Sequence, residues 1–258
     1  NKTKATTDET KATTYLGNRG YTVYKNSVSE IDKENIRKEL LVKPYIPKSI
    51  ITQTPFPVYR ESSQKMYLPR FYGTHRYGVP DKIEIPEGDN INANFKGGLR
   101  DYQVNIVNKF IGHIKDNNNI GGGLLEVDTG MGKTICALNI ISVLKKKTLI
   151  VVHKEFLMDQ WIERINEFLP GTSVGKIQGK TMDIEGKDIC IAMLQSLSMK
   201  DYDLTQFASF GFTIIDEVHH MGAEVFSQAL LKVVTYYVLG LSATMERKDG
   251  LTKVFKMF

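Results

Sequence analysis

The sequence predicts an α/β fold in which a parallel sheet carries a phosphate-binding loop, preceded by a smaller α+β region. Three observations support this prediction. From Leu99 onward, apolar β-branched runs alternate with segments of helical periodicity, which is typical of a parallel sheet covered on both faces. Residues 127–134 form a glycine-rich stretch ending in Gly-Lys-Thr. An acidic pair, Asp216 and Glu217, then follows a later apolar run.

The composition is that of an ordinary globular protein. The chain has 258 residues, of which 41% are apolar and 24% charged, so one or two domains are expected. Its two cysteines, Cys136 and Cys190, lie inside apolar runs. This excludes a disulfide framework and a zinc-ligand spacing, and it predicts core cysteines in a reducing compartment. Because there is neither an apolar signal segment nor a membrane-spanning run, we expect an intracellular protein without membrane contact.

Three regions follow from the pattern along the chain. Residues 1–14 contain Thr-Lys-Ala-Thr-Thr twice, which predicts a flexible polar tail. Residues 15–98 predict an accessory α+β domain, and residues 99–258 a nucleotide-binding domain. Within the accessory domain we expect strands at 21–24, 57–60 and 65–68 and a capped helix at 29–41. The chain starts at Asn1, so we expect it to be trimmed or selected from a longer sequence.

The accessory region carries the basic excess. Residues 1–98 hold 16 Lys+Arg against 11 Asp+Glu, whereas residues 99–258 hold 18 of each. Such an excess suits contact with a polyanion such as nucleic acid, although an ordinary solvated surface explains it equally well. Residues 70–78 alternate basic and aromatic side chains. That pattern fits a nucleic-acid strand, but a turn that lines the core is the commoner explanation.

The glycine-rich stretch has the residue types that polyphosphate binding requires. Gly130 and Gly132 lack Cβ atoms, so the loop can turn sharply and direct its N–H groups at phosphates. Lys133 can reach the β- and γ-phosphates, and the Thr134 hydroxyl can ligate Mg²⁺. A strand at 124–127 and a helix at 135–141 would place the phosphates at a helix N-terminus. Val127 departs from the general pattern, and a simple glycine-rich turn is the alternative.

The acidic pair supplies the remaining chemistry of such a site. Asp216 would complete a magnesium shell, and Glu217 would orient and deprotonate the water that attacks the γ-phosphate. The alternative is a solvated strand end. Strands are expected at 148–153, 173–177, 189–193, 212–215 and 236–241, with helices at 156–168 and 226–233. Trp161 is interpreted as core packing.

Five motifs in this order resemble the motor core of superfamily 2 helicases. Leu99-Arg100-Asp101-Tyr102-Gln103 resembles the element that opens this core, residues 130–134 resemble motif I, and Asp216-Glu217-Val218-His219 the DExH form of motif II. Ser242-Ala243-Thr244 is similar to motif III, and His153-Lys154 with Gln160-Trp161 to motif Ia and its helix. Residues 239–250 resemble the branch of DNA-repair and transcription-factor helicases. Residues 68–73 resemble helicases of large cytoplasmic DNA viruses, including poxvirus transcript-release helicases.

The resemblance implies a RecA-like lobe that uses ATP and Mg²⁺ and acts on nucleic acid, with DNA favoured over RNA. The implied site residues fall into four groups. The ATP-binding group is Arg100, Gln103, Thr129, Gly130, Met131, Gly132, Lys133 and Thr134. The magnesium ligands are Thr134 and Asp216, and Glu217 acts with Lys133 and Asp216 in catalysis. The implied coupling residues are His219, Ser242 and Thr244, and the implied nucleic-acid contacts are His153, Lys154, Gln195 and Ser196.

The resemblance also implies a partner lobe. Members of this superfamily use two RecA-like lobes, and we expect the second lobe, with its arginine finger, to lie outside this chain. We therefore expect an ATP-dependent helicase or translocase whose isolated chain turns over slowly, with a role in viral transcription alongside the transcription machinery. If viral, the protein is expected in the host cytoplasm or the virion. Two alternatives stay open: a non-catalytic nucleic-acid scaffold with structural ATP, and the translocase part of a restriction or remodelling enzyme.

Overall fold

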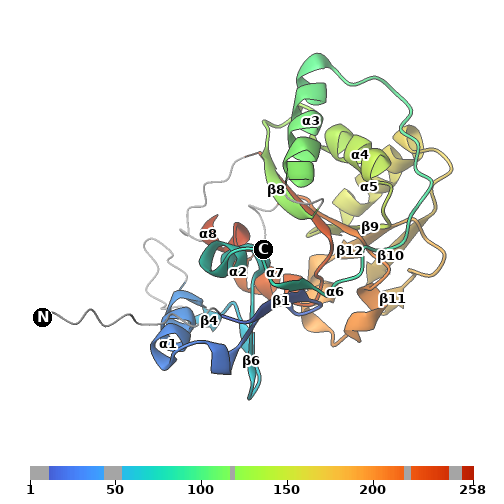
Figure 1. The fold of residues 1–258 in the computed structure, drawn as a ribbon. Coiled ribbons are helices and arrows are strands. Elements are labelled where there is room, and N and C mark those ends of the chain that lie inside the picture. Colours follow the sequence, from blue (N-terminus) through green and yellow to red (C-terminus); the bar gives the residue numbers. More distant parts are fainter. Residues whose placement is uncertain (1–11, 44–53, 117–119, 218–221, 244–251) are drawn as a thin grey trace, which may run out of the picture.

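The computed structural model describes residues 12–43, 54–116, 120–217, 222–243 and 252–258 (Figure 1). Two predicted coupling residues, His219 and Thr244, lie outside these ranges, as do residues 1–11 of the predicted tail. The predicted tail is one residue too long, because Thr14 is the first residue of strand β1 and pairs with Val23. No helix in the described ranges has the length and apolar character needed to cross a bilayer.

A seven-stranded sheet forms the larger part of the molecule. Its strands are β8 (Gly121–Glu126), β9 (Thr148–Val152), β10 (Val174–Gln178), β11 (Thr181–Met182), β12 (Ile189–Met193), β13 (Phe212–Ile215) and β14 (Tyr237–Ser242). Their order is β11-β10-β12-β9-β13-β14-β8, and every pair except β10–β11 is parallel. The predicted parallel sheet is therefore confirmed.

Helices cover both faces of this sheet. One face is covered by α3 (Asp101–Asp116), α4 (Lys133–Leu144) and α5 (Glu155–Phe168), and the other by α6 (Leu194–Met199) and α7 (Ala223–Leu230) (Figure 1). In β9, Leu149 and Val151 enter one hydrophobic cluster while Ile150 and Val152 enter the other. Each such side chain is fully buried and contributes about 1.5–3 kcal/mol to folding. This burial fixes the strand positions, and with them the strand ends.

The accessory region contains a second, mostly antiparallel sheet. It is built from β1 (Thr14–Gly17), β2 (Gly20–Tyr24), β5 (Arg60–Glu61), β6 (Lys65–Leu68) and β7 (Lys82–Ile83), in the order β5-β6-β2-β1-β7. Short pieces β3 (Leu41–Val42) and β4 (Phe56–Pro57) pair separately. Helix α1 (Glu30–Glu39) begins after Ser29, whose hydroxyl accepts from the Asp32 N–H. That cap confirms the capped helix predicted here.

The two sheets share one hydrophobic core. Tyr21, Met66 and Leu68 of the accessory sheet belong to the same cluster as Phe226 of α7 and Phe255 of α8 (Thr252–Phe255). Residues 84–98 leave the accessory sheet and run past the carboxyl ends of α4 and α5, where the Ile91 N–H donates to Lys145 O at 2.9 Å and the Lys96 N–H to Phe168 O at 2.7 Å. The division at residue 98 remains a prediction, but packing across it is continuous.

Residues 70–77 form helix α2 (Arg70–Tyr77), so the predicted turn is wrong although the predicted lining of the core is right. Gly73 lets the helix press on Tyr21, because a Cβ at this position would lie 2.2 Å from the tyrosine ring. The buried Arg70 guanidinium donates to Thr235 O at 2.8 Å and to Tyr236 O at 3.1 Å. Burial lowers the pKa of Arg70 to about 10. Arg70 therefore joins the accessory region to the entry of β14.

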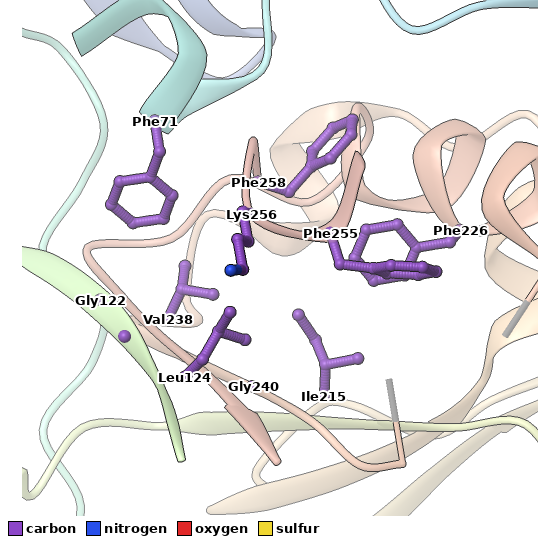
Figure 2. A pocket seen from close by; sticks show the side chains of 11 residues that line it. Phe71, Gly122, Leu124, Ile215, Phe226, Val238, Gly240, Phe255, Lys256 and Phe258 are labelled. Atoms are coloured by element: carbon purple, nitrogen blue, oxygen red, sulfur yellow. The ribbon is translucent and has the colours of Figure 1, made fainter. Parts of the chain in front are cut away.

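An apolar cavity of about 270 Å³ lies where α2, α7 and α8 meet the large sheet. Figure 2 shows its walls, formed by aromatic side chains above and by β-strand residues below. Glycines leave the space open, since Gly122 and Gly240 present no side chain to it. Its lining residues are Phe71, Gly122, Gly123, Leu124, Ile215, Phe226, Val238, Gly240, Phe255, Lys256 and Phe258. The cavity thus lies within the shared core, between Phe71 of α2 and strands β8, β13 and β14 of the large sheet.

Candidate nucleotide-binding site

The glycine-rich loop leaves the carboxyl end of β8 and enters α4, as the sequence predicts. At the start of the loop the Val127 N–H donates to Ser242 O at 3.0 Å, which ties the loop to the end of β14. Gly130 and Gly132 have φ values of 83° and 81°, in the left-handed region that glycine adopts without steric cost. The glycines at these two positions are therefore required by the backbone.

Gly132 also makes room for Gln103, one of the predicted ATP-binding residues. A Cβ on Gly132 would lie 2.4 Å from Gln103 Nε2, so any side chain there would displace the Gln103 amide from this position. Gln103 Nε2 donates to Met131 O at 3.2 Å, and its Oε1 accepts from the Arg100 N–H at 3.0 Å. The structure thus brings Arg100, Gln103 and Met131 together beside the loop. Their roles in ATP binding remain predictions.

Lys133 is the first residue of α4 and is buried. Its ammonium group donates to Val127 O at 3.0 Å and so lies folded over the loop. Thr134 follows in the first helical turn and is half-buried, whereas Thr129 is exposed. The helix N-terminus presents free N–H groups and a positive dipole at this point, which suits an anion such as a phosphate.

Asp216 and Glu217 follow β13, which is separated from β8 by β14. Asp216 is buried, and its N–H donates to Val151 O at 3.0 Å. Its carboxylate oxygen Oδ2 accepts from the indole Nε1–H of Trp161 at 2.8 Å. Burial raises the pKa of Asp216, and the Glu217 charge adds to this rise, while the hydrogen bond from Trp161 and the charge of Lys133 oppose it. A buried carboxylate in this setting favours a nearby cation.

Glu217 has a left-handed backbone, with φ of 53°. A residue with a Cβ pays strain of about 1–3 kcal/mol for such a conformation, and strained positions cluster at functional sites. Asp216 still lies on the same face of the sheet as Ile214, toward Trp161 of α5. The left-handed backbone at Glu217 turns the chain only after this residue.

The donor set fits Mg²⁺. Carboxylate and hydroxyl oxygens are the ligands that this ion prefers, and it usually keeps several waters and binds substrate phosphates as well. Asp216 and Thr134 provide one oxygen of each kind, and the charge of buried Asp216 needs compensation. Within the described ranges, no group of three or more His, Cys, Asp or Glu side chains could hold a metal by itself. A magnesium ion here would therefore rely on the nucleotide for part of its shell.

The predicted nucleic-acid contacts also lie at carboxyl ends of strands. His153 and Lys154 follow β9, and Gln195 and Ser196 follow β12, which is hydrogen-bonded to β9. Gln195 Nε2 donates to His153 O at 3.3 Å, so the two segments touch. Ser196 Oγ accepts from the Gly179 N–H at 2.9 Å. The structure brings these residues together at one edge, while their contact with nucleic acid stays a prediction.

Two residues near the site were not given a role from the sequence. The Tyr102 hydroxyl donates to Met131 O at 3.1 Å, beside the bond from Gln103. Trp161 is 2% exposed, so core packing is correct, but its N–H also contacts Asp216. Tyr102 belongs to the motif of residues 99–103, so its position next to Gln103 could have indicated a role at the site. Nothing in the spacing of residues 161 and 216 indicates that they meet.

A group of cations gathers on one face of the accessory sheet, here termed the outer face. Its basic residues are Arg19, Arg60, Lys65 and Lys82, and its tyrosines are Tyr15, Tyr24 and Tyr67. Cross-strand pairing places Arg60 opposite Tyr67, and Lys65 opposite Tyr24. The Lys65 ammonium lies 5.0 Å and 4.8 Å from the ring centroids of Tyr15 and Tyr24.

The four cations of the outer face form no salt bridge with any other residue that the structure describes. Elsewhere in the accessory region several cations are paired: Arg37 contacts Glu61, Lys33 contacts Glu30, and Arg76 contacts Glu39. The outer face differs from these pairs because no salt bridge within the described ranges compensates its four cations.

A phosphate loop and a carboxylate pair at the strand ends of one parallel sheet define a P-loop nucleotide-binding lobe of the helicase class. Comparison places the chain more closely: it belongs to the family described as Type III restriction enzyme, res subunit, whose pattern matches residues 96–247, within superfamily 2 helicases. The resemblance to superfamily 2 helicases that the sequence predicts is confirmed, and viral helicases are among the relatives.

Three relatives illustrate this placement. A protein of Acanthamoeba polyphaga mimivirus named as an ATP-dependent RNA helicase is 37% identical over 93% of this chain. The DNA 3'-5' translocase XPB2 of Sulfurisphaera tokodaii is 33% identical over 72% of it. The chain spans 46% and 41% of these two proteins. The UvsW helicase of bacteriophage T4 shares the fold, with a TM-score of 0.62 and 12% identity over 95% of this chain and 96% of that chain.

Proposed function

We propose that this chain carries the ATP-binding lobe of a nucleic-acid helicase or translocase that hydrolyses ATP. One observation supports this proposal above all. The Lys133 loop and the pair Asp216–Glu217 lie at strand ends of one sheet, and the buried carboxylate of Asp216 favours a cation beside it. The names of the relatives, an RNA helicase and a DNA translocase, agree with this proposal.

Binding would begin with a rearrangement of Lys133. Its ammonium leaves Val127 O, where it donates at 3.0 Å, and moves to the β- and γ-phosphates. The N–H groups of the loop and of the first turn of α4 receive the phosphate oxygens. Gln103 gives up its hydrogen bond to Met131 O and forms hydrogen bonds with the edge of the adenine base instead. Arg100 and Tyr102 lie next to it and border the same site.

Hydrolysis is a direct transfer of the γ-phosphoryl group to water. Mg²⁺, held by Asp216 and Thr134, would neutralise charge on the phosphate oxygens. Glu217 accepts the proton of the attacking water as the new P–O bond forms and the bond to ADP breaks, which gives phosphate and ADP. The γ-phosphate then no longer links the loop to the elements around it. Loss of that link is the switch that drives movement along the strand.

Nucleic acid would lie along His153, Lys154, Gln195 and Ser196, with the outer face of the accessory sheet as a second, electrostatic contact. We propose DNA as the substrate, in line with the named activity of the archaeal translocase. Backbone phosphates are the target in both places, because cations contact them without reading sequence. A second RecA-like lobe would complete the ATP site, and Ser242, His219 and Thr244 would couple hydrolysis to strand movement.

We also propose an intracellular setting, which the two free buried cysteines support. A role in viral transcription, alongside the transcription machinery, is a further proposal that the mimivirus relative supports. A non-catalytic scaffold remains the competing function. The translocase part of a restriction enzyme is a second alternative, in line with the description of the family. The scaffold has no use for Glu217, which only the hydrolytic step requires.

The test is ATP turnover measured with and without DNA or RNA, in the longest available form of the protein. We expect stimulation by nucleic acid and a larger effect of DNA than of RNA. Tight ATP binding with no turnover under any of these conditions would establish the scaffold instead. Stimulation by RNA alone would retain the motor but overturn DNA as its substrate.

A further inference from the structure

Trp161 and Asp216 form a buried contact between two motifs that are 55 residues apart in the chain. The indole Nε1–H donates to Asp216 Oδ2 at 2.8 Å, and the two side chains are 2% and 7% exposed. Trp161 is the only tryptophan in the sequence. It lies in the middle of α5, far from the nucleotide loop in sequence, yet it contacts the candidate magnesium ligand.

We propose that Trp161 is a positioning residue for Asp216, fixing the carboxylate so that Oδ1 faces Mg²⁺ or one of its waters. This inference rests on the proposed function, because it needs a nucleotide-bound magnesium ion. It goes beyond that function by giving Trp161, a core residue in the helix that follows motif Ia, a second role at the candidate magnesium ligand.

The chemistry of the indole group suits this role. An indole N–H can only donate a hydrogen bond, so it cannot compete with Asp216 for a cation. Because the indole N–H occupies Oδ2, the other carboxylate oxygen, Oδ1, is left for a metal ion and its direction is fixed. Partners of this kind orient metal ligands in many sites, and removing them typically costs roughly 10–100-fold in metal affinity.

Packing holds the donor in place. Trp161 belongs to the hydrophobic cluster between the sheet and α3, α4 and α5, together with Met158 and Ile165 of its own helix. The Asp216 N–H is in turn fixed to Val151 O of β9. Both ends of the contact are therefore anchored in the core, and the carboxylate has little freedom to rotate.

The experiment compares Trp161→Phe with the wild-type chain by the binding of mant-ADP, with Mg²⁺ and with EDTA. Phenylalanine keeps most of the packing and removes only the donor. We expect the Mg²⁺-dependent gain in affinity to fall by roughly 10–100-fold, with affinity in EDTA unchanged and partial recovery at high Mg²⁺. A purely structural role would lower both affinities together and would overturn the proposal.

Tyr21→Phe is the matched control. It removes an equally buried aromatic donor, whose hydroxyl donates to Gly78 O at 3.0 Å, far from the nucleotide loop. We expect this variant to keep the full Mg²⁺-dependent gain. An equal loss in Tyr21→Phe would attribute the effect to general loosening of the core and overturn the positioning role.

A double-mutant cycle with Asp216→Asn isolates the contact. If Trp161 acts through Asp216, Trp161→Phe should change the Mg²⁺ dependence in the wild-type background and not in the Asn background. Equal effects in both backgrounds would contradict the inference. If the wild-type chain gains no affinity from Mg²⁺, the proposed function fails at this site and the inference fails with it. If the wild type gains affinity and Trp161→Phe gains as much, only the inference fails.

Discussion

The nucleotide site and the outer face of the accessory sheet use polar groups in opposite ways. At the site, polar side chains are held by defined hydrogen-bond partners, as Asp216 is by Trp161 and Lys133 by Val127 O. On the outer face, Lys65 and Arg19 lie over tyrosine rings and form no salt bridge with any residue in the described ranges. The first arrangement selects one ligand geometry, whereas the second supplies a field that attracts any polyanion. Substitutions should therefore have large, salt-insensitive effects at the site and small, salt-dependent effects on the outer face.

Lys133→Ala should have the largest effect on nucleotide binding. It removes a charged donor from the phosphates, and each such bond contributes about 1.5–3 kcal/mol, so affinity should fall roughly 10–100-fold. Titration with mant-ATP in the presence of Mg²⁺ measures this. Lys154→Ala, at an exposed strand end, serves as the control and should leave nucleotide affinity unchanged. Equal affinity of wild type and Lys133→Ala would show that phosphates bind elsewhere.

Gly132→Ala should damage the loop more than Gly130→Ala. Both positions have positive φ, which costs a residue with a Cβ about 1–3 kcal/mol. Only at Gly132 would the added carbon also lie 2.4 Å from Gln103, since the space beside Gly130 is open. Thermal unfolding and mant-ATP titration of the two variants provide the comparison. Identical losses would mean that the contact with Gln103 is unimportant.

Asp216→Asn should stabilise the chain without metal while removing the Mg²⁺ dependence of nucleotide binding. The raised pKa of Asp216 means that its charge destabilises the folded state at neutral pH. As pH falls through the raised pKa, the folded wild type takes up a proton and its stability should approach that of the variant. Thermal unfolding in EDTA across this pH range measures the difference. A variant less stable than wild type at neutral pH would contradict it.

Lys65→Ala should have the smallest effect, confined to nucleic acid. Removing one phosphate contact weakens binding evenly across sequences and reduces the salt slope by about 1. Fluorescence anisotropy with labelled DNA at several salt concentrations measures this. Arg37→Ala is the control, because Arg37 is already paired with Glu61 at 2.9 Å. A Lys65 variant with an unchanged slope would exclude the outer face as a contact.

The sequence identifies the nucleotide loop and the acidic pair because local chemistry demands those residue types. Gly132 must be glycine for its φ, and Asp216 must follow a buried strand. Parallel pairing then brings the carboxyl ends of the strands together, so the edge of the sheet that carries the site could be predicted as well. The contact of Trp161 with Asp216 could not, since it depends on how α5 packs on β13. Helix α2 was missed for a similar reason: Arg70 is buried only because the Thr235 and Tyr236 carbonyls receive it.

The central claim is that Glu217 is the base of an ATP-hydrolysing site built by Lys133 and Asp216. The most direct measurement compares Glu217→Gln with wild type in a single turnover of bound ATP, with binding measured in parallel. We predict ATP affinity close to that of wild type and a rate lower by roughly 10²–10⁴-fold, the usual contribution of a general base. Hydrolysis by Glu217→Gln at the wild-type rate would contradict the account.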